Sequence, residues 1–267
     1  MGAPPDRPDA DGGRRFALVL EYDGTAYRGS QYQDNGPSIQ QMLESAIGQL
    51  TGERVRVAFA GRTDTGVHAL GQVAAFDSRT RLGPGELMKG LNHFLPPDIA
   101  VRAAREVERT FDPRRDARSR VYRYRILNRP ARSPLERLRA WHIEKPLDVE
   151  TMRRAAVLLE GEHDFAAFAG PYDGPTVRTL RRCEVTRKGC VVTVEMEAQA
   201  FLPHQVRRSV GPLAEVGLGR TSAEALGVLL SEARPSSAGP AAPAHGLYLV
   251  RVDYDGVEIA PGDGWNR

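Results

Sequence analysis

The sequence has few cysteines, few lysines and no long apolar run, and each scarcity excludes a class of protein. Its two cysteines, Cys183 and Cys190, have no CxxC spacing and no second pair, which argues against a disulfide framework and a cysteine zinc site. The longest stretch without a charged side chain, residues 235–250, contains three prolines and so cannot be a membrane span. We therefore expect a protein of the reducing cytoplasm with no membrane or metal partner.

The opening residues also lack a charged segment followed by an apolar one. They read MGAPPDRPDADGG, rich in proline, glycine and aspartate, so we expect residues 1–14 to be a disordered lead-in without a secretion signal or lipid anchor. The chain as a whole has 267 residues, of which 41% are hydrophobic, enough to bury a core. That length fits one large domain or two of about 130 residues, and composition does not choose between them.

The charged residues are unevenly distributed. The formal net charge is only +3, from 37 basic and 34 acidic residues, and the three lysines leave 34 arginines. Between Arg102 and Arg139 there are 13 arginines and five acids, a local charge of +8, so the rest of the chain carries −5. Basic side chains gathered on one face neutralise phosphates and release counterions, which favours a nucleic-acid partner. An arginine-rich coding bias would explain the few lysines but not the clustering.

The first part of the chain predicts the element order β-α-β-β-α-β. Ser38 and Gln41 form a capping box at the start of one helix, and Pro84 begins a second helix that Pro96 and Pro97 stop. Runs of apolar residues indicate strands at residues 16–22, 55–59, 72–76 and 99–107. This order is that of a split βαβ unit.

The second part repeats the pattern of elements without repeating the sequence. Asp148 is placed to cap a helix, and a turn at residues 187–189 joins two strands in a hairpin. The expected elements are strands at 121–127, 177–186, 190–197 and 247–254, and helices from 148, at 205–216 and at 222–230.

These patterns together predict an α/β (α+β) fold of two units whose sheets can merge into one. The linker between the units is expected near residues 108–118. The predicted organisation is an N-terminal domain at residues 15–112 that carries the loop described below, a C-terminal domain at residues 113–255, and a tail at residues 256–267.

One connection in the first unit is long for a hairpin. Between Phe59 and Gln72 the chain reads AGRTDTGVHALG, whereas hairpin loops usually span about two to five residues. The loop places Arg62, Asp64 and His68 among three glycines, which permit unusual backbone angles and close approach of another chain. The alternative is a purely structural loop, in which Asp64 caps a turn and Arg62 pairs with a surface carboxylate. An isolated match to so short a sequence pattern favours this alternative.

Three kinds of chemistry can be weighed for this loop. Asp64 and His68 have the spacing of two metal ligands, but no second cluster completes a metal site. A glycoside-hydrolase pair needs a second carboxylate in a comparable setting, and the sequence offers none. The third is a lone carboxylate beside an arginine, which favours the ionised form and makes Asp64 fit to act as a nucleophile.

Five blocks of the sequence follow one another as in a known enzyme family. They are Tyr22-Asp23-Gly24-Thr25, GRTDTGVHA at 61–69, SRVYRYRI at 119–126, VRRSVG at 206–211 and AGPAAPAHGLYL at 238–249. Together they resemble the tRNA pseudouridine synthases of the TruA type, from about residue 16 to residue 254, and the 61–69 block is the most specific. The resemblance implies two RRM-like (ferredoxin-like) units that share a mixed, mainly antiparallel sheet flanked by helices, usually in a homodimer with basic clefts for tRNA.

The activity that the resemblance implies is isomerisation of uridine to pseudouridine at positions 38, 39 and 40 of the tRNA anticodon stem-loop, with no metal or organic cofactor. Asp64 matches the family's catalytic aspartate, taken as the nucleophile. The sequence leaves open whether Asp64 attacks the ribose or the base, or deprotonates the sugar. Each route needs an unprotonated carboxylate beside a uridine taken out of its stack.

Four further residues match the family's site. Arg62 matches the loop arginine expected to fill the space of the flipped base or to position the strand. Tyr122 matches the tyrosine that packs on the target base, as an aromatic face can. Arg207 matches an arginine that pairs with the catalytic aspartate, and Leu247 matches an apolar wall of the pocket.

The residues alone leave other roles open for the same positions. Tyr122 and Leu247 also suit a core, Arg207 can pair with Glu215 on its own helix, and His68 reads as a structural loop histidine.

The chain departs from the family's pattern in a few places. Ser30 stands where a large apolar residue is usual, which leaves the local packing or an RNA contact open, and Ser209 replaces an aliphatic helix residue.

Two competing hypotheses are the same chemistry on another RNA and a noncatalytic RNA-binding protein on the same scaffold. A pure binder would not need the combination of site residues found here.

Overall fold

The structure is a computed structural model that describes residues 13–256 and residue 259. The predicted lead-in and tail lie outside the described residues, apart from a few positions at their inner ends. Arg14 already belongs to the first strand, so regular structure begins inside the range predicted for the lead-in.

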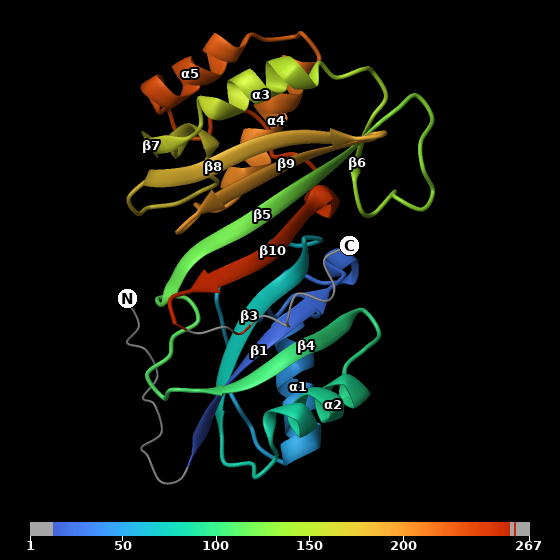
Figure 1. The fold of residues 1–267 in the computed structure, drawn as a ribbon, viewed down its shortest axis with the longest axis vertical. Helices are drawn as coiled ribbons and strands as arrows, with labels where there is room; N and C mark the ends of the chain where they lie inside the picture. The colour runs from blue at the N-terminus through green and yellow to red at the C-terminus, as the bar shows by residue number, and fades with distance from the viewer. Residues whose placement is uncertain (1–12, 257–258, 260–267) are drawn as a thin grey trace.

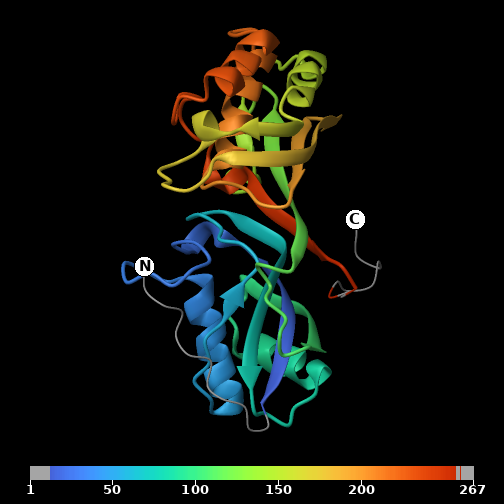
Figure 2. The ribbon, with the colours of Figure 1, turned by 90° about the vertical axis from the view of Figure 1, so that its left-hand side faces the viewer.

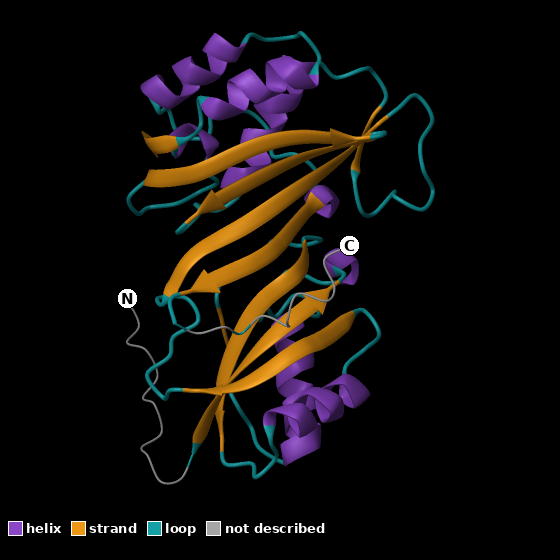
Figure 3. Cartoon of the chain, in the orientation of Figure 1, coloured by secondary structure: helices purple, strands orange, loops and turns teal. Residues whose placement is uncertain are grey.

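The elements follow the predicted alternation of strands and helices (Figures 1 and 3). In chain order they are β1 (Arg14–Tyr22), η1 (Gly24–Ala26), α1 (Ile39–Thr51), β2 (Ala58–Phe59), β3 (His68–Ser78), α2 (Pro84–Phe94), β4 (Ile99–Val107), β5 (Ala117–Asn128), β6 (Trp141–Ile143), α3 (Val149–Val157), β7 (Gly161–Asp164), η2 (Ala166–Phe168), β8 (Val177–Lys188), β9 (Val191–Ala198), α4 (Gln205–Gly217), α5 (Ala223–Glu232), η3 (Ala244–Gly246) and β10 (Leu247–Tyr254).

All strands belong to one sheet in the order β4-β1-β3-β10-β5-β9-β8-β7, with β2 paired to β3 and β6 paired to β5. The first half contributes β4-β1-β3-β2 and the second half contributes β10-β5-β9-β8. When the four strands of each half are numbered in chain order, both halves have the arrangement 4-1-3-2, as in a split βαβ unit. This confirms the predicted fold class and the merged sheet.

The last strand of the chain joins the two halves of the sheet. β10 pairs antiparallel with β5 and parallel with the start of β3, where Tyr248 lies opposite His68 and Leu249 opposite Ala69 (Figure 1, red beside teal). A β-carbon on Gly71 would lie 2.5 Å from the carbonyl oxygen of Val250, so only glycine allows β3 and β10 to approach this closely. The glycine-rich end of the predicted loop thus serves the junction between the halves.

The helices begin where the sequence places their caps. Ser38 Oγ accepts from the N–H of Gln41 at 3.3 Å, and Gln41 Oε1 accepts from the N–H of Ser38 at 2.9 Å, which forms the expected capping box of α1. Asp148 accepts from the N–H of Thr151 at 3.0 Å and caps α3 in the same manner. These local hydrogen bonds satisfy donors that have no partner within the helix.

The strand predicted at residues 55–59 is wrong except for its last two residues. The backbone of Val57 is held by side chains of α1 instead of by a strand: its N–H donates to Glu44 at 2.9 Å and its carbonyl accepts from Gln40 at 3.1 Å. β3 also begins at His68, earlier than predicted, so the loop that carries Asp64 spans residues 60–67. Because the family resemblance matches Asp64 to a catalytic aspartate, we call residues 60–67 the catalytic loop from here on.

The core lies between the sheet and the helices and runs through both halves. Figures 1 and 2 show an elongated molecule with α1 and α2 at one end and α3, α4 and α5 at the other. A second, smaller cluster of buried side chains covers the opposite face of the first half, and it includes Phe111 from the linker and Ile259. Among the described residues, no helix has the length and apolarity to cross a bilayer.

Candidate active site

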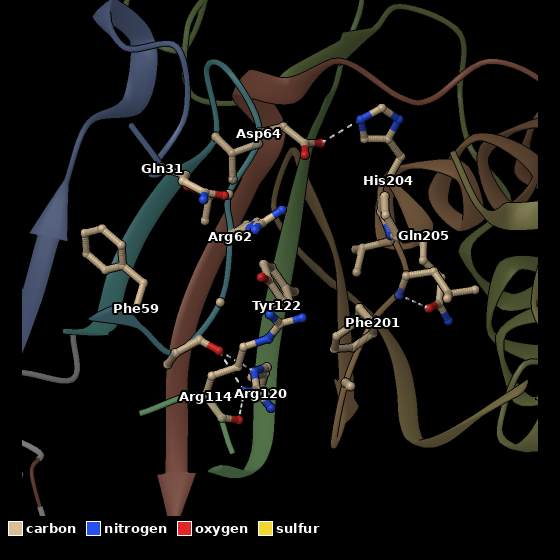
Figure 4. A pocket seen from close by; sticks show the side chains of 18 of the residues that line it. Gln31, Phe59, Arg62, Asp64, Arg114, Arg120, Tyr122, Phe201, His204 and Gln205 are labelled. Carbon is tan, nitrogen blue, oxygen red and sulfur yellow. Dashed lines mark hydrogen bonds and ion pairs between the residues drawn. The ribbon is translucent and has the colours of Figure 1, made fainter. Parts of the chain in front are cut away.

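A large cavity lies where the two halves of the sheet meet. Its volume is about 790 Å³, within the usual range of ligand sites. One wall is β2 and the catalytic loop, the floor is β5, and the other wall runs from the end of β9 into α4; Leu247 of β10 completes it. Figure 4 shows Asp64 and Arg62 on one side, Tyr122 in the middle and His204 on the other. The cavity therefore takes residues from both units.

The catalytic loop is held from behind by hydrogen bonds to buried groups. The N–H of Thr63 donates to Ser30 Oγ at 2.9 Å, and the N–H of Ser30 donates to the carbonyl of Thr63 at 3.1 Å. The side chain of Thr63 shares a hydrogen bond of 2.8 Å with the hydroxyl of Tyr22. Ser30 is fully buried, so the departure noted in the sequence belongs to the support of the loop.

The turn after Asp64 brings its side chain into the cavity. Gly66 has φ of +77°, a left-handed conformation that favours glycine, and the N–H of Val67 donates to the carbonyl of Asp64 at 3.1 Å. The carboxylate of Asp64 is 31% exposed. The backbone turn thus leaves the carboxylate free to face the cavity instead of capping the loop.

Arg207 pairs with Asp64, as the family resemblance implied. Arg207 Nη1 donates to Asp64 Oδ2 at 2.8 Å, while its Nε donates to the carbonyl of Ala242 at 2.8 Å, so the guanidinium is fixed from two sides. The alternative partner, Glu215, is bound to Arg220 at 2.9 Å instead. The structure therefore brings together two predicted site residues that are far apart in the sequence.

Tyr122 and Leu247 lie on neighbouring strands at the bottom of the cavity. Tyr122 is 7% exposed, and its ring packs edge-on against Phe201 with ring centroids 5.2 Å apart. Burial raises the pKa of Tyr122, so its hydroxyl is protonated at neutral pH. Leu247, also buried, lies opposite Tyr124 on β5. Both side chains are part of the core and line the cavity at once, so the two roles left open by the sequence are compatible.

Arg62 lies on the exposed side of the loop, next to the cavity. Its side chain is shown between Gln31 and Tyr122 in Figure 4. Within the part of the chain that the structure describes, no carboxylate pairs with Arg62. Its charge is therefore available to a bound anion.

His204 is a cavity residue that the sequence did not reveal. Its Nε2 lies 3.7 Å from Asp64 Oδ2, and its φ of +62° is uncommon for a residue with a β-carbon. A β-carbon on Gly170 would lie 2.8 Å from His204 Nδ1, so a glycine leaves room for the ring. A non-glycine residue in this conformation produces no sequence pattern, which explains why it was missed.

His68 is not at the cavity surface, because it is buried at the start of β3. Its Nδ1 accepts from the N–H of Gly24 at 3.1 Å, and its Nε2 lies 3.0 and 3.2 Å from the carbonyls of Leu138 and His245, to which it donates in the neutral form. The ring stacks on Tyr248 at 4.7 Å between centroids. Burial lowers the pKa of His68, consistent with a neutral ring that joins three segments.

The cavity is far more basic than the chain as a whole. Among its described lining residues, Asp64 is the only acidic side chain, and seven are arginines: Arg56, Arg62, Arg114, Arg115, Arg120, Arg178 and Arg207. Only three of these come from the arginine-rich segment at residues 102–139. Several others of that segment form ion pairs elsewhere on the molecule: Arg102 with Glu21, Arg118 with Asp255, Arg123 with Glu195, Arg125 with Glu136 and Arg139 with Asp23.

The arginine-rich segment at residues 102–139 therefore does not supply the basic surface alone, as its clustering in the sequence suggested. Clustering along the chain does not produce one basic face, because β4 and β5 point alternate residues to opposite sides of the sheet. The basic surface instead combines arginines from both halves. In the described residues, no group of three or more His, Cys, Asp or Glu side chains is arranged to hold a metal ion.

Known proteins resemble this chain over most of its length. A family model described as tRNA pseudouridine synthase matches residues 18–114 and 155–255. The tRNA pseudouridine synthase A of Myxococcus xanthus is 50% identical over 243 residues, 90% of this chain and 92% of that protein. The proteins of that name from Rhodospirillum rubrum and Geotalea uraniireducens are 47% and 45% identical; the alignments cover 92% and 90% of this chain, and 90% and 100% of those proteins.

One solved structure is also similar, although weakly. A Cbf5-Nop10-Gar1 complex aligns over 76% of this chain and 45% of its own, with 14% identity and a TM-score of 0.31, too low to support any argument. The family model and the curated relatives, by contrast, extend over both halves of the sheet and include the catalytic loop. This chain belongs to the tRNA pseudouridine synthase family.

Proposed function

We propose that this enzyme isomerises uridine to pseudouridine at positions 38, 39 and 40 of the tRNA anticodon stem-loop, with Asp64 as the nucleophile and with no metal or organic cofactor. The observation that carries the proposal is the position of Asp64 as the one described acid in a cavity lined by seven arginines. Membership of the family supports the type of reaction and the class of RNA.

The reaction rearranges one nucleotide and needs no second substrate. The bond between ribose C1′ and uracil N1 breaks, the base turns, and C1′ joins uracil C5. The proton on C5 leaves and N1 gains a proton, so the product is an isomer of the substrate. A carboxylate can supply the electron pair for attack on C1′, attack on the base, or removal of a sugar proton.

The contacts of Asp64 suit this role. Arg207 and His204 both approach the same oxygen, Oδ2. Among the described residues no protein donor is bound to Oδ1, which leaves that oxygen for the nucleotide. The hydrogen bond from Arg207 fixes the plane of the carboxylate, and orientation of a reacting group lowers the barrier.

The neighbouring side chains fit a flipped uridine. The ring of Tyr122 and the side chain of Leu247 supply an aromatic and an apolar surface against which a base can pack. Arg62 lies beside this surface and can occupy the space left in the RNA or hold the strand. The remaining exposed arginines of the cavity face solvent, where phosphate contacts would give affinity and register while the pocket selects the base.

We extend the proposal to the assembly, the location and the domain boundaries. Cys183 and Cys190 are both free thiols, which supports a cytoplasmic location because such thiols persist in a reducing compartment. The homodimer rests on the family resemblance, and light scattering of the purified protein tests it. The boundaries at residues 15–112 and 113–255 are supported by the assignment of a complete strand set to each half, with β10 completing the second.

One experiment tests the function directly. The purified protein is incubated with unmodified tRNA transcripts that carry uridines in the anticodon arm, and pseudouridine is mapped by chemical probing. We expect product at positions 38, 39 and 40 and none in transcripts with cytidine there. Product only at other uridines or in another RNA would replace the target, and no product in any RNA would overturn the enzymatic function.

A further inference from the structure

Arg120 is one of the seven arginines that line the cavity, but it is buried, and the chemistry proposed above gives it no individual role. It lies on β5, two residues before Tyr122, and is 7% exposed. Within the described residues no carboxylate is paired with it. Burial lowers the pKa of Arg120, as expected when a charge is removed from water. A buried charge of this kind is costly unless hydrogen bonds compensate for it.

The guanidinium of Arg120 donates to three backbone carbonyls in three different segments. Nε and Nη2 donate to the carbonyl of Ala60 at 3.0 and 2.7 Å. Nη2 also donates to the carbonyl of Arg114 at 2.7 Å, and Nη1 donates to the carbonyl of Gln199. Figure 4 shows Arg120 beside Arg114 below Tyr122. One side chain thus joins the start of the catalytic loop, the linker before β5 and the end of β9.

The segments that Arg120 joins are those that carry the reacting carboxylate and its partner. Ala60 is the first residue of the catalytic loop, and its own N–H donates to the carbonyl of Val73 at 2.8 Å, so its backbone is fixed on both sides. Gln199 begins the connection from β9 to α4, which contains Arg207. The distance between these two segments determines whether Asp64 and Arg207 meet.

We propose that Arg120 is a positioning residue for the reaction, which acts by holding the catalytic loop and the β9–α4 connection at a fixed spacing. The inference rests on the proposed function. The residue type fits the task because a planar guanidinium has five N–H donors in a rigid fork and can bind carbonyls in several directions at once, whereas a lysine ammonium cannot match that arrangement.

The test uses Arg120→Lys in the full chain, which keeps the positive charge and removes the fork. The control is Arg123→Lys on the same strand, where Arg123 binds Glu195 at 2.9 Å and does not line the cavity. Pseudouridine formation is measured in single turnover with saturating tRNA, at a temperature where circular dichroism shows both variants folded. We expect at least a tenfold lower rate for Arg120→Lys, a Kd for tRNA within about threefold of the wild type, and little change for Arg123→Lys.

Hydrogen exchange gives a readout that does not depend on activity. We expect the backbone amides of residues 60–67 to exchange at least tenfold faster in Arg120→Lys than in the wild type, with α1 and α2 unchanged and no such effect in Arg123→Lys. If Arg120→Lys fails to fold, Arg120→Met is used in its place. Added guanidinium ion, which replaces the missing group, is then expected to slow hydrogen exchange in residues 60–67, whereas added ammonium ion is not.

The outcomes separate this inference from the function itself. A wild-type rate for Arg120→Lys, or unchanged exchange in residues 60–67, overturns the positioning role while the proposed function stands. A loss of tRNA affinity as large as the loss of rate assigns Arg120 to RNA binding and likewise overturns it. If the wild-type enzyme modifies no tRNA, the proposed function fails, and the exchange measurement still decides whether Arg120 holds the loop.

Discussion

Replacing Asp64 with asparagine separates the chemistry of the site from its folding. The two side chains have nearly the same shape, and asparagine keeps a carbonyl oxygen that can accept the hydrogen bond from Arg207 Nη1. What asparagine lacks is the negative charge, and with it the electron pair that every route to pseudouridine requires. The expected result is a protein that folds and binds tRNA but does not turn over.

The structure sets the size of both effects. The side chains of Asp64 and Arg207 are 31% and 16% exposed, and an ion pair open to solvent contributes about 1 kcal/mol or less to the free energy of unfolding. A change of that size lowers the melting temperature by about 2–4 °C in a chain of this length. Removal of a catalytic group usually costs about 10⁴–10⁶ in rate, or about 5–8 kcal/mol of barrier.

The assay follows from the bonds that change. Because C1′ joins uracil C5, tRNA carrying tritium at C5 releases the label as the product forms. The matched control is Asp77→Asn, since Asp77 also pairs with an arginine, Arg15, at 2.7 Å but lies outside the cavity. We expect this control to retain wild-type release of tritium and to lose a similar amount of stability.

The ratio of the two effects can refute the reasoning. Tritium release by Asp64→Asn above about 1% of the wild-type rate would show that the charge of Asp64 is not essential. A fall in melting temperature well beyond that of Asp77→Asn would show that Asp64 is chiefly a structural residue, and a parallel loss of tRNA affinity would show that it binds RNA.

Three further predictions concern the neighbouring groups. Tyr122→Phe keeps the ring that packs on the base and is expected to retain most tRNA affinity, whereas Tyr122→Leu loses about 1–3 kcal/mol of stacking; equal affinities by titration would contradict a stacking role. The five arginines of the cavity other than Arg120 and Arg207 are expected to contact phosphate. At about 0.7 for each contact, a plot of log Kd for tRNA against log salt concentration should have a slope of about 3.5, and a slope near zero in a filter-binding series would exclude these contacts. The pKa of His68 is lowered by burial, so the unfolded chain binds the proton first as pH falls below about 6.5, and the free energy of unfolding should fall with it. The pKa of His245 is also lowered by burial, so both histidines contribute to the pH dependence of the wild type. The contribution of His68 is the part of the slope of unfolding free energy against pH that His68→Gln loses, measured by urea melts between pH 7 and 5. An unchanged slope would show that His68 does not titrate in that range.

Local patterns predicted the parts of the fold that depend on neighbours in sequence. The capping box of Ser38 and Gln41 marks the start of α1 because its hydrogen bonds join residues three positions apart. Runs of apolar residues placed β1 and β4 for the same reason. The strand expected at 55–59 was mostly wrong because side chains of α1 bind the backbone of Val57, a contact that periodicity does not encode.

The candidate site was predicted through motifs, and its geometry came from the fold. The catalytic loop and the block around Arg207 are recognisable in sequence, but the pair between Asp64 and Arg207 depends on two segments that are 143 positions apart. His204 gave no signal, because its position depends on a backbone conformation. Arg120 lies in two segments that the sequence singled out, but its individual role could not be predicted because it depends on carbonyls supplied by three distant segments.

The sequence by itself determined the two α/β units, the loop that carries Asp64 and the family to which the chain belongs. Only the tertiary structure decided that β10 joins the two halves, that the site lies at this junction and that its basic surface combines arginines from both units. The physical reason is that caps and periodicity arise from contacts between near neighbours, whereas the pairing of strands and the convergence of charges depend on packing between residues far apart in the chain.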